Sequence, residues 1–378
     1  MDVQLKRLSL MDFRNHQALD LELGPQVNCF IGPNGTGKTN LLDAVHYLSL
    51  CKSYFDATDS NNVRHGQEAF MIKGSVKEDN GEHELLCAVQ RGKRKVFQRD
   101  RKDYERLADH VGRYPAVIVT PYDGQLVSEG SELRRRFLDG LISQFDREYL
   151  EALMRYNRAL AQRNVSLKRM VGNGRVDRAS LEPWDAQLIE HGTMVHRVRV
   201  EFLARAVPSV LKHYQGIGQG PEEVALEYRS ALHDASLTSL LDHAWERDRL
   251  VGHTTQGVHK DDLVFLIDGH PLKRFGSQGQ QKTFLIALKL AQFDLTHERT
   301  GRKPILMLDD IFDKIDPMRM RHLLQLLSAR QFGQVFITDT DASRIHQALD
   351  GSPLDVRFFH LSHDGPIHVE TIERAVAG

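Results

Sequence analysis

Residues 32–39 follow the pattern G-x-x-x-x-G-K-T and read Gly32-Pro33-Asn34-Gly35-Thr36-Gly37-Lys38-Thr39. Glycines in this pattern let backbone N–H groups converge on phosphate oxygens, and a following helix adds partial positive charge. The apolar run 27–31 precedes the pattern, and residues 38–50 have the apolar spacing of an amphipathic helix. A strand, a glycine loop and a helix in this order predict a phosphate-binding loop; a chance match is the minor alternative.

This loop predicts ATP and Mg²⁺ as cofactors, with all eight residues in contact with the nucleotide. The Lys38 ammonium supplies a point charge to the phosphates and is counted among the catalytic groups. The Thr39 hydroxyl is the expected ligand of Mg²⁺.

A second segment carries two carboxylates. Residues 305–308 are apolar and lead directly into Asp309 and Asp310. At the carboxyl end of a strand next to the phosphate loop, Asp309 can hold Mg²⁺ directly or through water. Asp310 is then the candidate that orients the attacking water or takes its proton. The alternative is a strand end that carries two solvated acids.

A third segment, residues 277–281, reads Ser-Gln-Gly-Gln-Gln. Ser277 is expected to cap a helix, and the N–H groups around Gly279 complete an anion site at the helix N-terminus. Together with the phosphate loop, this turn predicts that each copy of the chain serves the nucleotide of its partner in an ATP-dependent homodimer. The alternative is an ordinary helix cap without a ligand.

The order of elements predicts a mixed α/β protein. Residues 68–97 read as an antiparallel meander with a turn at Asn80-Gly81, and residues 116–119 as a buried strand. Residues 132–168 and 183–216 read as two helices of a hairpin, with Leu150, Leu153 and Met154 on the apolar face of the first. Residues 263–267 are expected to re-enter the main sheet. The last third alternates between helices at 277–292, 318–327 and 343–349 and strands at 304–308 and 335–337.

Composition limits the other features. With 378 residues and a formal net charge of −1, any contact with nucleic acid must come from local basic patches. The three cysteines have no metal-binding spacing and are expected to be buried thiols in a reducing cytosol. No signal peptide or membrane span is evident, so we predict a cytoplasmic protein without a membrane partner.

Basic residues gather in three places, and each can contact a DNA backbone. The first candidates are Arg91, Lys93, Arg94 and Lys95. The second lie along the first long helix, namely Arg155, Arg158, Arg163, Lys168 and Arg169. The third is the run Arg134-Arg135-Arg136, which is equally well explained by pairing with Asp123 and Asp139. Solvated helix faces explain the second set equally well.

At this point the chain resembles the RecF family, bacterial DNA-repair ATPases related to the ABC and SMC heads, over nearly its whole length. The matching motifs are L-S-L-M-D-F-R-N at 8–15, G-P-N-G-T-G-K-T-N-L-L at 32–42, R-R-R-F-L at 134–138, Y-L at 149–150, R-Y-N at 155–157, Q-R-N at 162–164, H-K-D-D-L at 259–263 and S-Q-G-Q-Q at 277–281. The segment 134–164 is the most specific, because transport ATPases lack it. Departures are Lys260 for Arg, Tyr122 for an acid, Gly124 for Leu and Asp43 for Glu.

The resemblance implies an ABC-type, SMC-like ATPase head with an inserted helical arm. We expect the head at residues 1–120 and 256–378, and the arm at 121–255. The resemblance also assigns Arg14 and Asn15 to the nucleotide, and gives Gln125 a role in sensing Mg²⁺ or the γ-phosphate.

The family further implies an ATP-dependent dimer that binds DNA at gaps between double and single strands. With RecO and RecR it loads the recombinase, and it supports gap repair, replication restart and the SOS response to DNA damage. ATP hydrolysis is then weak, stimulated by DNA and used as a switch.

Three other classes share parts of this pattern. The nucleotide-binding subunit of an ABC transporter would share the sheet and the loop, but it normally has Glu at position 310 and a His after the strand that contains residues 335–337. An SMC-like structural protein needs a far longer coiled coil. A small-molecule kinase would not need the Ser-Gln-Gly turn.

Overall fold

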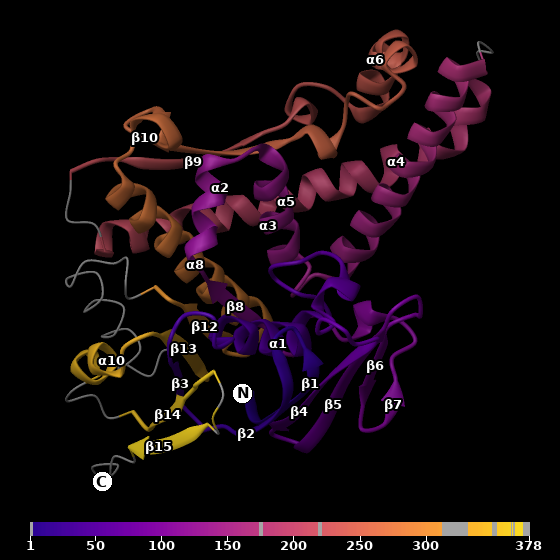
Figure 1. The fold of residues 1–378 in the computed structure, drawn as a ribbon. Coiled ribbons are helices and arrows are strands. Elements are labelled where there is room, and N and C mark those ends of the chain that lie inside the picture. Colours follow the sequence, from indigo (N-terminus) through magenta and orange to yellow (C-terminus); the bar gives the residue numbers. More distant parts are fainter. Residues whose placement is uncertain are drawn as a thin grey trace. The chain divides into compact units, whose positions relative to one another are not determined.

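The computed structural model describes residues 3–173, 177–217, 221–311, 332–349, 354–363, 365 and 367–372. The chain forms two compact units (Figure 1): Met1–Asp123 together with Leu288–Gly378, and Gly124–Ala287. The sequence-based division used 120/121 and 255/256 instead. Whether the two units are the functional head and arm stays a prediction.

The first unit contains two six-stranded sheets. The antiparallel sheet has the order β2-β1-β4-β5-β6-β7. Its strands are β1 (Gln4–Phe13), β2 (His16–Glu22), β4 (Ala69–Glu78), β5 (Gly81–Gln90), β6 (Val96–Arg99) and β7 (Lys102–Asp103). Its strands β4, β5 and β6 correspond to the predicted meander. The hairpin turn lies at Asp79-Asn80, one residue earlier than predicted, because Glu78 pairs with Gly81.

The second sheet has the order β15-β14-β3-β13-β12-β8, and only β15 runs antiparallel to its neighbour. Its strands are β3 (Val27–Ile31), β8 (Ala116–Val119), β12 (Ile305–Asp309), β13 (Val335–Asp339), β14 (Val356–His360) and β15 (His368–Ile372). β3, β8, β12 and β13 are buried at every residue, as parallel strands covered on both faces must be.

Helix α1 (Lys38–Leu50) packs against strands of both sheets, so a single apolar core holds the first unit together. The buried Gln334 side chain also ties the sheets to each other. Its amide accepts from Leu5 N at 2.8 Å and donates to Leu5 O at 2.9 Å and to Gly24 O at 2.7 Å. The shared core and Gln334 therefore hold the two sheets together around the helix that follows the phosphate loop. The three cysteines are buried, as predicted.

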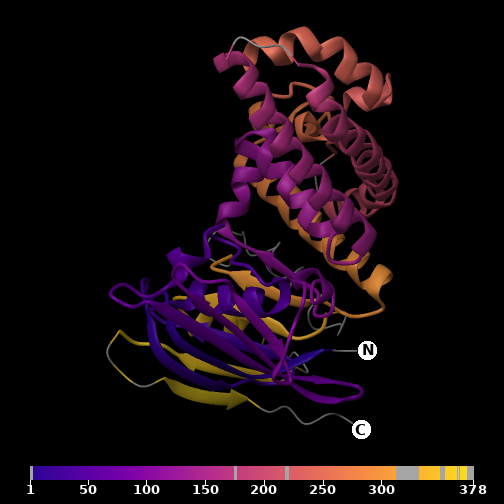
Figure 2. The ribbon, with the colours of Figure 1, turned by 90° about the vertical axis from the view of Figure 1, so that its right-hand side faces the viewer.

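The second unit is mainly helical, and Figure 2 shows its two longest helices side by side. The helices are α2 (Gly124–Ser128), α3 (Ser131–Ile142), α4 (Arg147–Asn173), α5 (Glu182–Ile217), α6 (Leu237–Val251) and α7 (Leu272–Phe275). The strands are β9 (Val224–Arg229), β10 (Asp262–Ile267) and β11 (His270–Pro271). Helix α8 (Gln278–Thr300) begins in this unit and ends in the first, which also contains α10 (Ala342–Ala348). Six 3-10 turns complete the described elements: Asp59–Asn62, Leu107–Asp109, Pro121–Asp123, Ala179–Leu181, Ala231–His233 and Val258–Lys260.

Several sequence-based expectations need correction. Residues 132–168 form two helices, because the helix is interrupted between Ile142 and Arg147. Strand β10 does not re-enter the main sheet but forms a separate sheet of order β11-β10-β9. The predicted helix at 318–327 lies outside the described residues. Among the described residues, no helix combines the length and apolar character that a membrane crossing requires.

The buried face of α4 also differs from the predicted one. Met154 is 58% exposed, whereas Tyr149, Ala152, Tyr156 and Ala159 are buried. The helix therefore packs through tyrosine and alanine side chains, and the leucines at 150, 153 and 160 lie at the border of this face.

Candidate nucleotide site

The glycines of the phosphate loop are required by its geometry. Gly35 and Gly37 have positive φ angles of 86° and 94°, a region that favours glycine. A Cβ atom on Gly37 would lie 2.5 Å from both Asn15 Oδ1 and His16 Nε2, and one on Gly32 would collide with Leu361 O. Neighbouring segments therefore approach the loop so closely that only a backbone without side chains fits.

Lys38 places its charge inside this loop. Its Nζ donates to Gly32 O at 2.7 Å and to Pro33 O at 3.1 Å, and the residue is only 4% exposed. A buried ammonium held by carbonyl oxygens is prepared to exchange them for phosphate oxygens, which bind a cation more strongly. The position agrees with the role predicted for Lys38.

Asp309 is the centre of a buried hydrogen-bond cluster. Its Oδ1 accepts from Thr39 Oγ1 and from Thr338 Oγ1, each at 2.8 Å. Thr338 Oγ1 in turn accepts from Asp310 N at 2.9 Å. The structure therefore brings together Thr39 and the two aspartates at the phosphate loop, although β13 lies between β3 and β12 in the sheet.

The charge state of this cluster is tuned by burial. Burial raises the pKa of Asp309, while the hydrogen bonds from Thr338 and Thr39 act in the opposite direction. Asp310 is partly exposed, and its φ of 44° is left-handed, which is uncommon for a residue with a side chain. Such strain is often kept at functional sites. The two neighbouring carboxylates differ in burial, because Asp309 is 2% exposed and Asp310 is partly exposed.

The oxygen groups of this cluster suit Mg²⁺. The ion prefers oxygen ligands and usually binds through one or two protein groups together with phosphate oxygens and water. The Thr39 hydroxyl and the Asp309 carboxylate provide two such groups at one point. Nowhere in the described part of the chain do three carboxylate, imidazole or thiol groups gather into a self-sufficient metal site. Magnesium held here would neutralise phosphate charge, and its remaining ligands would come from the nucleotide.

The rim of the loop contains one predicted residue, Asn15, and two that sequence reasoning missed. Asn15 Nδ2 donates to Gly35 O at 3.4 Å, and Asn40 Nδ2 donates to Asn15 Oδ1 at 2.7 Å. His16 Nε2 lies 3.1 Å from Gly37 O and donates to it, because a carbonyl oxygen can only accept; burial lowers the pKa of this ring. Asn40 and His16 directly follow predicted site residues, which is the signal that could have found them.

Arg14 has a different partner from the one expected. Its Nη2 forms an ion pair of 2.8 Å with Asp43 Oδ2 and donates to Ser53 Oγ at 3.1 Å. The Asp43 side chain is fully buried, so the pair joins the β1–β2 turn to α1. The assignment of Arg14 to the nucleotide stays a prediction.

Ser277 lies in the second unit and caps α8 as predicted. Its Oγ accepts from Gln280 N at 3.2 Å, and Gln280 Oε1 accepts from Ser277 N at 2.8 Å. This reciprocal pair is a capping box. Ser277 is exposed and so is the neighbouring Phe275, at 57%. Gln125, in α2, is also exposed, and its role is untested.

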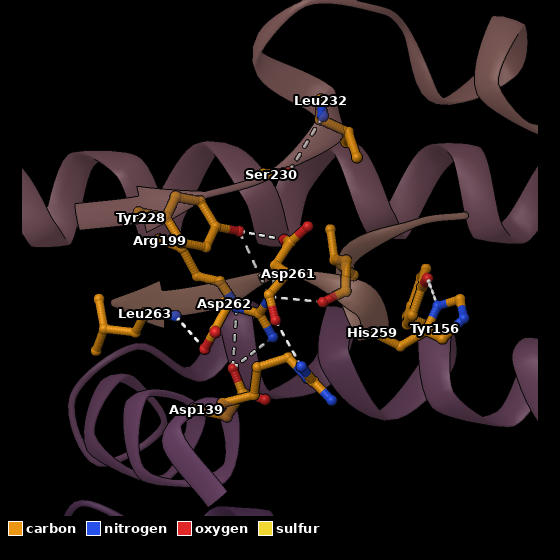
Figure 3. Close-up of polar contacts among 12 residues, drawn as sticks. Asp139, Tyr156, Arg199, Tyr228, Ser230, Leu232, His259, Asp261, Asp262 and Leu263 are labelled. Atoms are coloured by element: carbon orange, nitrogen blue, oxygen red, sulfur yellow. Dashed lines mark hydrogen bonds and ion pairs between the residues drawn. The ribbon is translucent and has the colours of Figure 1, made fainter. Parts of the chain in front are cut away.

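The H-K-D-D-L segment, residues 259–263, is structural (Figure 3). Arg199 of α5 is buried between Asp139 and Asp261, with N–O distances of 2.8 and 3.2 Å. The Tyr228 hydroxyl donates to the same Asp261 carboxylate. A buried guanidinium needs such partners, because an unpaired one costs several kcal/mol. The segment therefore holds the core of the second unit together.

Two expectations for basic residues are wrong, and a third candidate, Lys95, has protein partners of its own. Arg134 pairs with Asp262 at 2.8 Å, Arg135 donates to the Asp261 carbonyl, and Arg136 pairs with Glu132, so the triple Arg does not use Asp123 or Asp139. Arg163 is 1% exposed and pairs with Asp185 and Asp248. Lys95 pairs with Asp59 at 2.8 Å and donates to Cys51 O. Arg163 is too deeply buried to contact a DNA backbone, whereas Lys95 is only half-buried and its contact with DNA stays a prediction.

The remaining DNA candidates are exposed. In the segment after β5 these are Arg91, Lys93 and Arg94. On α4 they are Arg155, Arg158, Lys168 and Arg169. Arg91 and Arg94 make only long hydrogen bonds, 3.4 Å to Gln67 O and 3.3 Å to Glu105 O. Their charges face solvent, which a DNA contact requires but does not prove.

A phosphate loop after a central parallel strand, with two aspartates at the end of β12 and a capped Ser-Gln-Gly turn, defines an ABC-type nucleotide-binding fold of the SMC-head class. The family model described as "RecF/RecN/SMC N terminal domain" matches residues 4–358. The chain belongs to the RecF family of DNA replication and repair proteins.

Individual relatives agree with this assignment. DNA replication and repair protein RecF of Phocaeicola vulgatus is 44% identical over 365 residues, which is 96% of this chain and 97% of that one. RecF of Bacteroides thetaiotaomicron is 44% identical over 359 residues, or 94% and 96% of the two chains. A solved structure of the recombination mediator protein RecF with ATP in the RecFOR pathway has 27% identity, a TM-score of 0.87 and 98% coverage of both chains. An Smc head domain of Pyrococcus furiosus, at 13% identity and a TM-score of 0.57, covers 98% of this chain and 96% of its own and shares the fold.

Proposed function

We propose that this chain is an ATP-dependent DNA-binding protein of recombinational repair. It dimerises on DNA at gaps between double and single strands, where RecO and RecR help it to load the recombinase. Replication restart and the SOS response depend on this step, which takes place in the cytoplasm. The observation that carries the proposal is the Thr39–Asp309–Thr338–Asp310 cluster beside Lys38, in a chain that belongs to the RecF family.

ATP and Mg²⁺ are the proposed cofactors. The loop supplies N–H groups and one ammonium for the phosphates, and Thr39 with Asp309 supplies oxygen ligands for the metal. Solved RecF structures named as complexes with ATP and ATPrS support the choice of nucleotide. The transporter alternative loses its basis, because the family assignment extends over the arm segment that transport ATPases lack.

The proposed dimer uses the exposed end of α8. Ser277 and the free N–H groups of the helix N-terminus form an anion site. The anion that we propose for this site comes from a second copy of the chain. The exposed Phe275 beside it provides apolar area that a partner surface can cover. A γ-phosphate bound to the loop of a second copy has the charge that this site prefers.

Hydrolysis is proposed to be slow and stimulated by DNA, and to serve release rather than metabolism. Asp310→Asn should preserve ATP binding, lower turnover at least about tenfold and accumulate the nucleotide-bound dimer, because the attacking water loses its base. Single-turnover hydrolysis and the lifetime of the ATP-bound dimer measure both effects. A full hydrolysis rate in this variant would move the base to Asp309, with Gln125 as a candidate to orient the attacking water.

DNA binding is proposed to involve the basic segment after β5. Reversing the charges of Arg91, Lys93 and Arg94 should weaken DNA binding and reduce the slope of log affinity against log salt by about 0.9 for each lost phosphate contact. Lys95 is left intact because it is structural. The matched control reverses Lys6 and Lys77, which lie at the opposite end of the same sheet.

Fluorescence anisotropy on gapped DNA at several salt concentrations, with ATP affinity measured in parallel, tests this prediction. An unchanged slope would exclude the β5 segment and direct the search to Arg155 and Arg158. If variants of neither set changed DNA binding, the partner proteins would be the main source of DNA affinity.

A further inference from the structure

Lys289 is a buried lysine with a complete set of partners. The residue, on α8, is 2% exposed. Its Nζ lies 2.9 Å from Asp123 Oδ1 and donates to Ile118 O at 2.9 Å and to the Tyr54 hydroxyl at 3.1 Å. Burial of a charged ammonium is unfavourable unless such partners are present. The buried position of Lys289 therefore depends on these three contacts.

The ion pair joins the two places where the chain passes between the compact units. The chain leaves the first unit after Asp123 and returns at Leu288, so Asp123 and Lys289 flank the two crossings on the side of the first unit. The second oxygen of Asp123 accepts from Thr120 N at 2.6 Å. One buried pair therefore fixes the ends of both crossings to each other and, through Ile118, to strand β8.

Tyr54 connects this pair to the phosphate-loop helix. Its hydroxyl donates to Asp123 Oδ1 at 2.6 Å, and its backbone N–H donates to Asp43 Oδ1 at 2.7 Å. Asp43 lies in the second turn of α1 and also holds Arg14 and Ser53. The Tyr54 side chain therefore contacts the Asp123–Lys289 pair at the two crossings, while the Tyr54 backbone contacts the helix that starts at Lys38.

We propose that Tyr54 and the Asp123–Lys289 pair are positioning residues that couple nucleotide binding at residues 32–39 to the second unit, which carries Ser277. The inference rests on the proposed ATP-dependent dimerisation and specifies how that dimerisation is regulated. A shift of α1 on nucleotide binding displaces the Asp43 carboxylate, and the Tyr54 backbone follows it. The Tyr54 hydroxyl then moves the buried pair to which it is hydrogen-bonded, and both crossings move with it.

The test separates ATP binding from coupling in the full-length chain. Tyr54→Phe removes one hydroxyl and keeps the ring that packs edge-on against His46, so the fold should persist. The matched control is Tyr104→Phe, because the Tyr104 hydroxyl is buried without a hydrogen-bond partner among the described residues. For each protein, ATP affinity is measured by equilibrium dialysis and the ATP-dependent dimer dissociation constant by analytical ultracentrifugation.

Tyr54→Phe should leave ATP affinity within about twofold of the parent and raise the dimer dissociation constant at least about tenfold, the loss expected from one charge-assisted hydrogen bond. Tyr104→Phe should change neither quantity. Unchanged dimerisation in Tyr54→Phe would overturn the inference, and so would a parallel loss of ATP affinity, which would make Tyr54 part of the site itself. A parent protein that binds ATP without dimerising would instead refute the proposed function.

A second pair of variants tests whether the three residues act as one unit. Lys289→Met should weaken dimerisation more than Tyr54→Phe, with circular dichroism used to verify that it folds. The double variant should lose little beyond Lys289→Met alone, because residues of one network are not additive. Fully additive losses would mean that Tyr54 and Lys289 act independently and would overturn the coupling.

Discussion

Lys38→Ala is expected to lower ATP affinity by about 100-fold. The ammonium is buried in the loop, where it makes two hydrogen bonds to carbonyl oxygens that phosphate oxygens would replace. Hydrogen bonds to a charged group contribute roughly 1.5–3 kcal/mol each, and about 2.7 kcal/mol corresponds to a factor of 100. No other described lysine or arginine makes a hydrogen bond to the loop backbone, so no neighbouring charge compensates.

Equilibrium dialysis with labelled ATP measures this loss. Lys77→Ala, an exposed lysine of β4, is the control for a general change of charge. Parent-like affinity in Lys38→Ala would show that residues 32–39 do not form the nucleotide site.

Ser277→Arg is expected to abolish ATP-dependent dimerisation while each chain still binds ATP. The substitution replaces a capping hydroxyl by a bulky side chain at the exposed helix end, where the phosphate of the second copy is proposed to lie. An added positive charge would attract an anion at a distance, so the predicted loss depends on steric exclusion from the N–H groups. The expected change is from a dimer to a monomer at every accessible concentration.

Ser277→Ala is the matched control for this variant. It removes the cap, which typically costs about 1 kcal/mol of helix stability, but it leaves space for the phosphate. Partial weakening with Ala and complete loss with Arg would support contact across the dimer. A Ser277→Arg protein that still dimerises with ATP in sedimentation experiments would rule out the sandwich arrangement.

The nucleotide loop could be predicted from the sequence because its residues are contiguous. A strand, eight loop residues and a helix determine the local backbone without reference to the rest of the chain. Asp309 and Asp310 were also found, since an apolar strand that ends in two acids is a local pattern. Thr338 was missed as a member of the cluster, because its contact with Asp309 depends on β13 lying beside β12.

The helical unit was less predictable because its core is partly polar. Arg163 and Arg199 are buried in ion pairs, so a reading based on apolar periodicity misplaced the face of α4 and put Arg163 on the surface. The break before α4 did have a local signal. Asp146 Oδ1 accepts from Tyr149 N at 2.8 Å, the arrangement of a helix N-cap.

The boundaries between the units depend on contacts that are distant in sequence. β10 pairs with β9 and β11, and this pairing keeps residues 262–287 with the helical unit. A run of apolar residues such as 263–267 predicts a strand but not its sheet, because the partner strands are set by the whole fold.

Multi-angle light scattering of the full-length chain tests the central claim most directly. One chain has a mass of 43.1 kDa. With ATP and Mg²⁺ the measured mass should be that of two chains, with ADP it should not, and gapped DNA should increase the share of dimer at a given ATP concentration. A mass of one chain at saturating ATP, both with and without gapped DNA, would contradict the account.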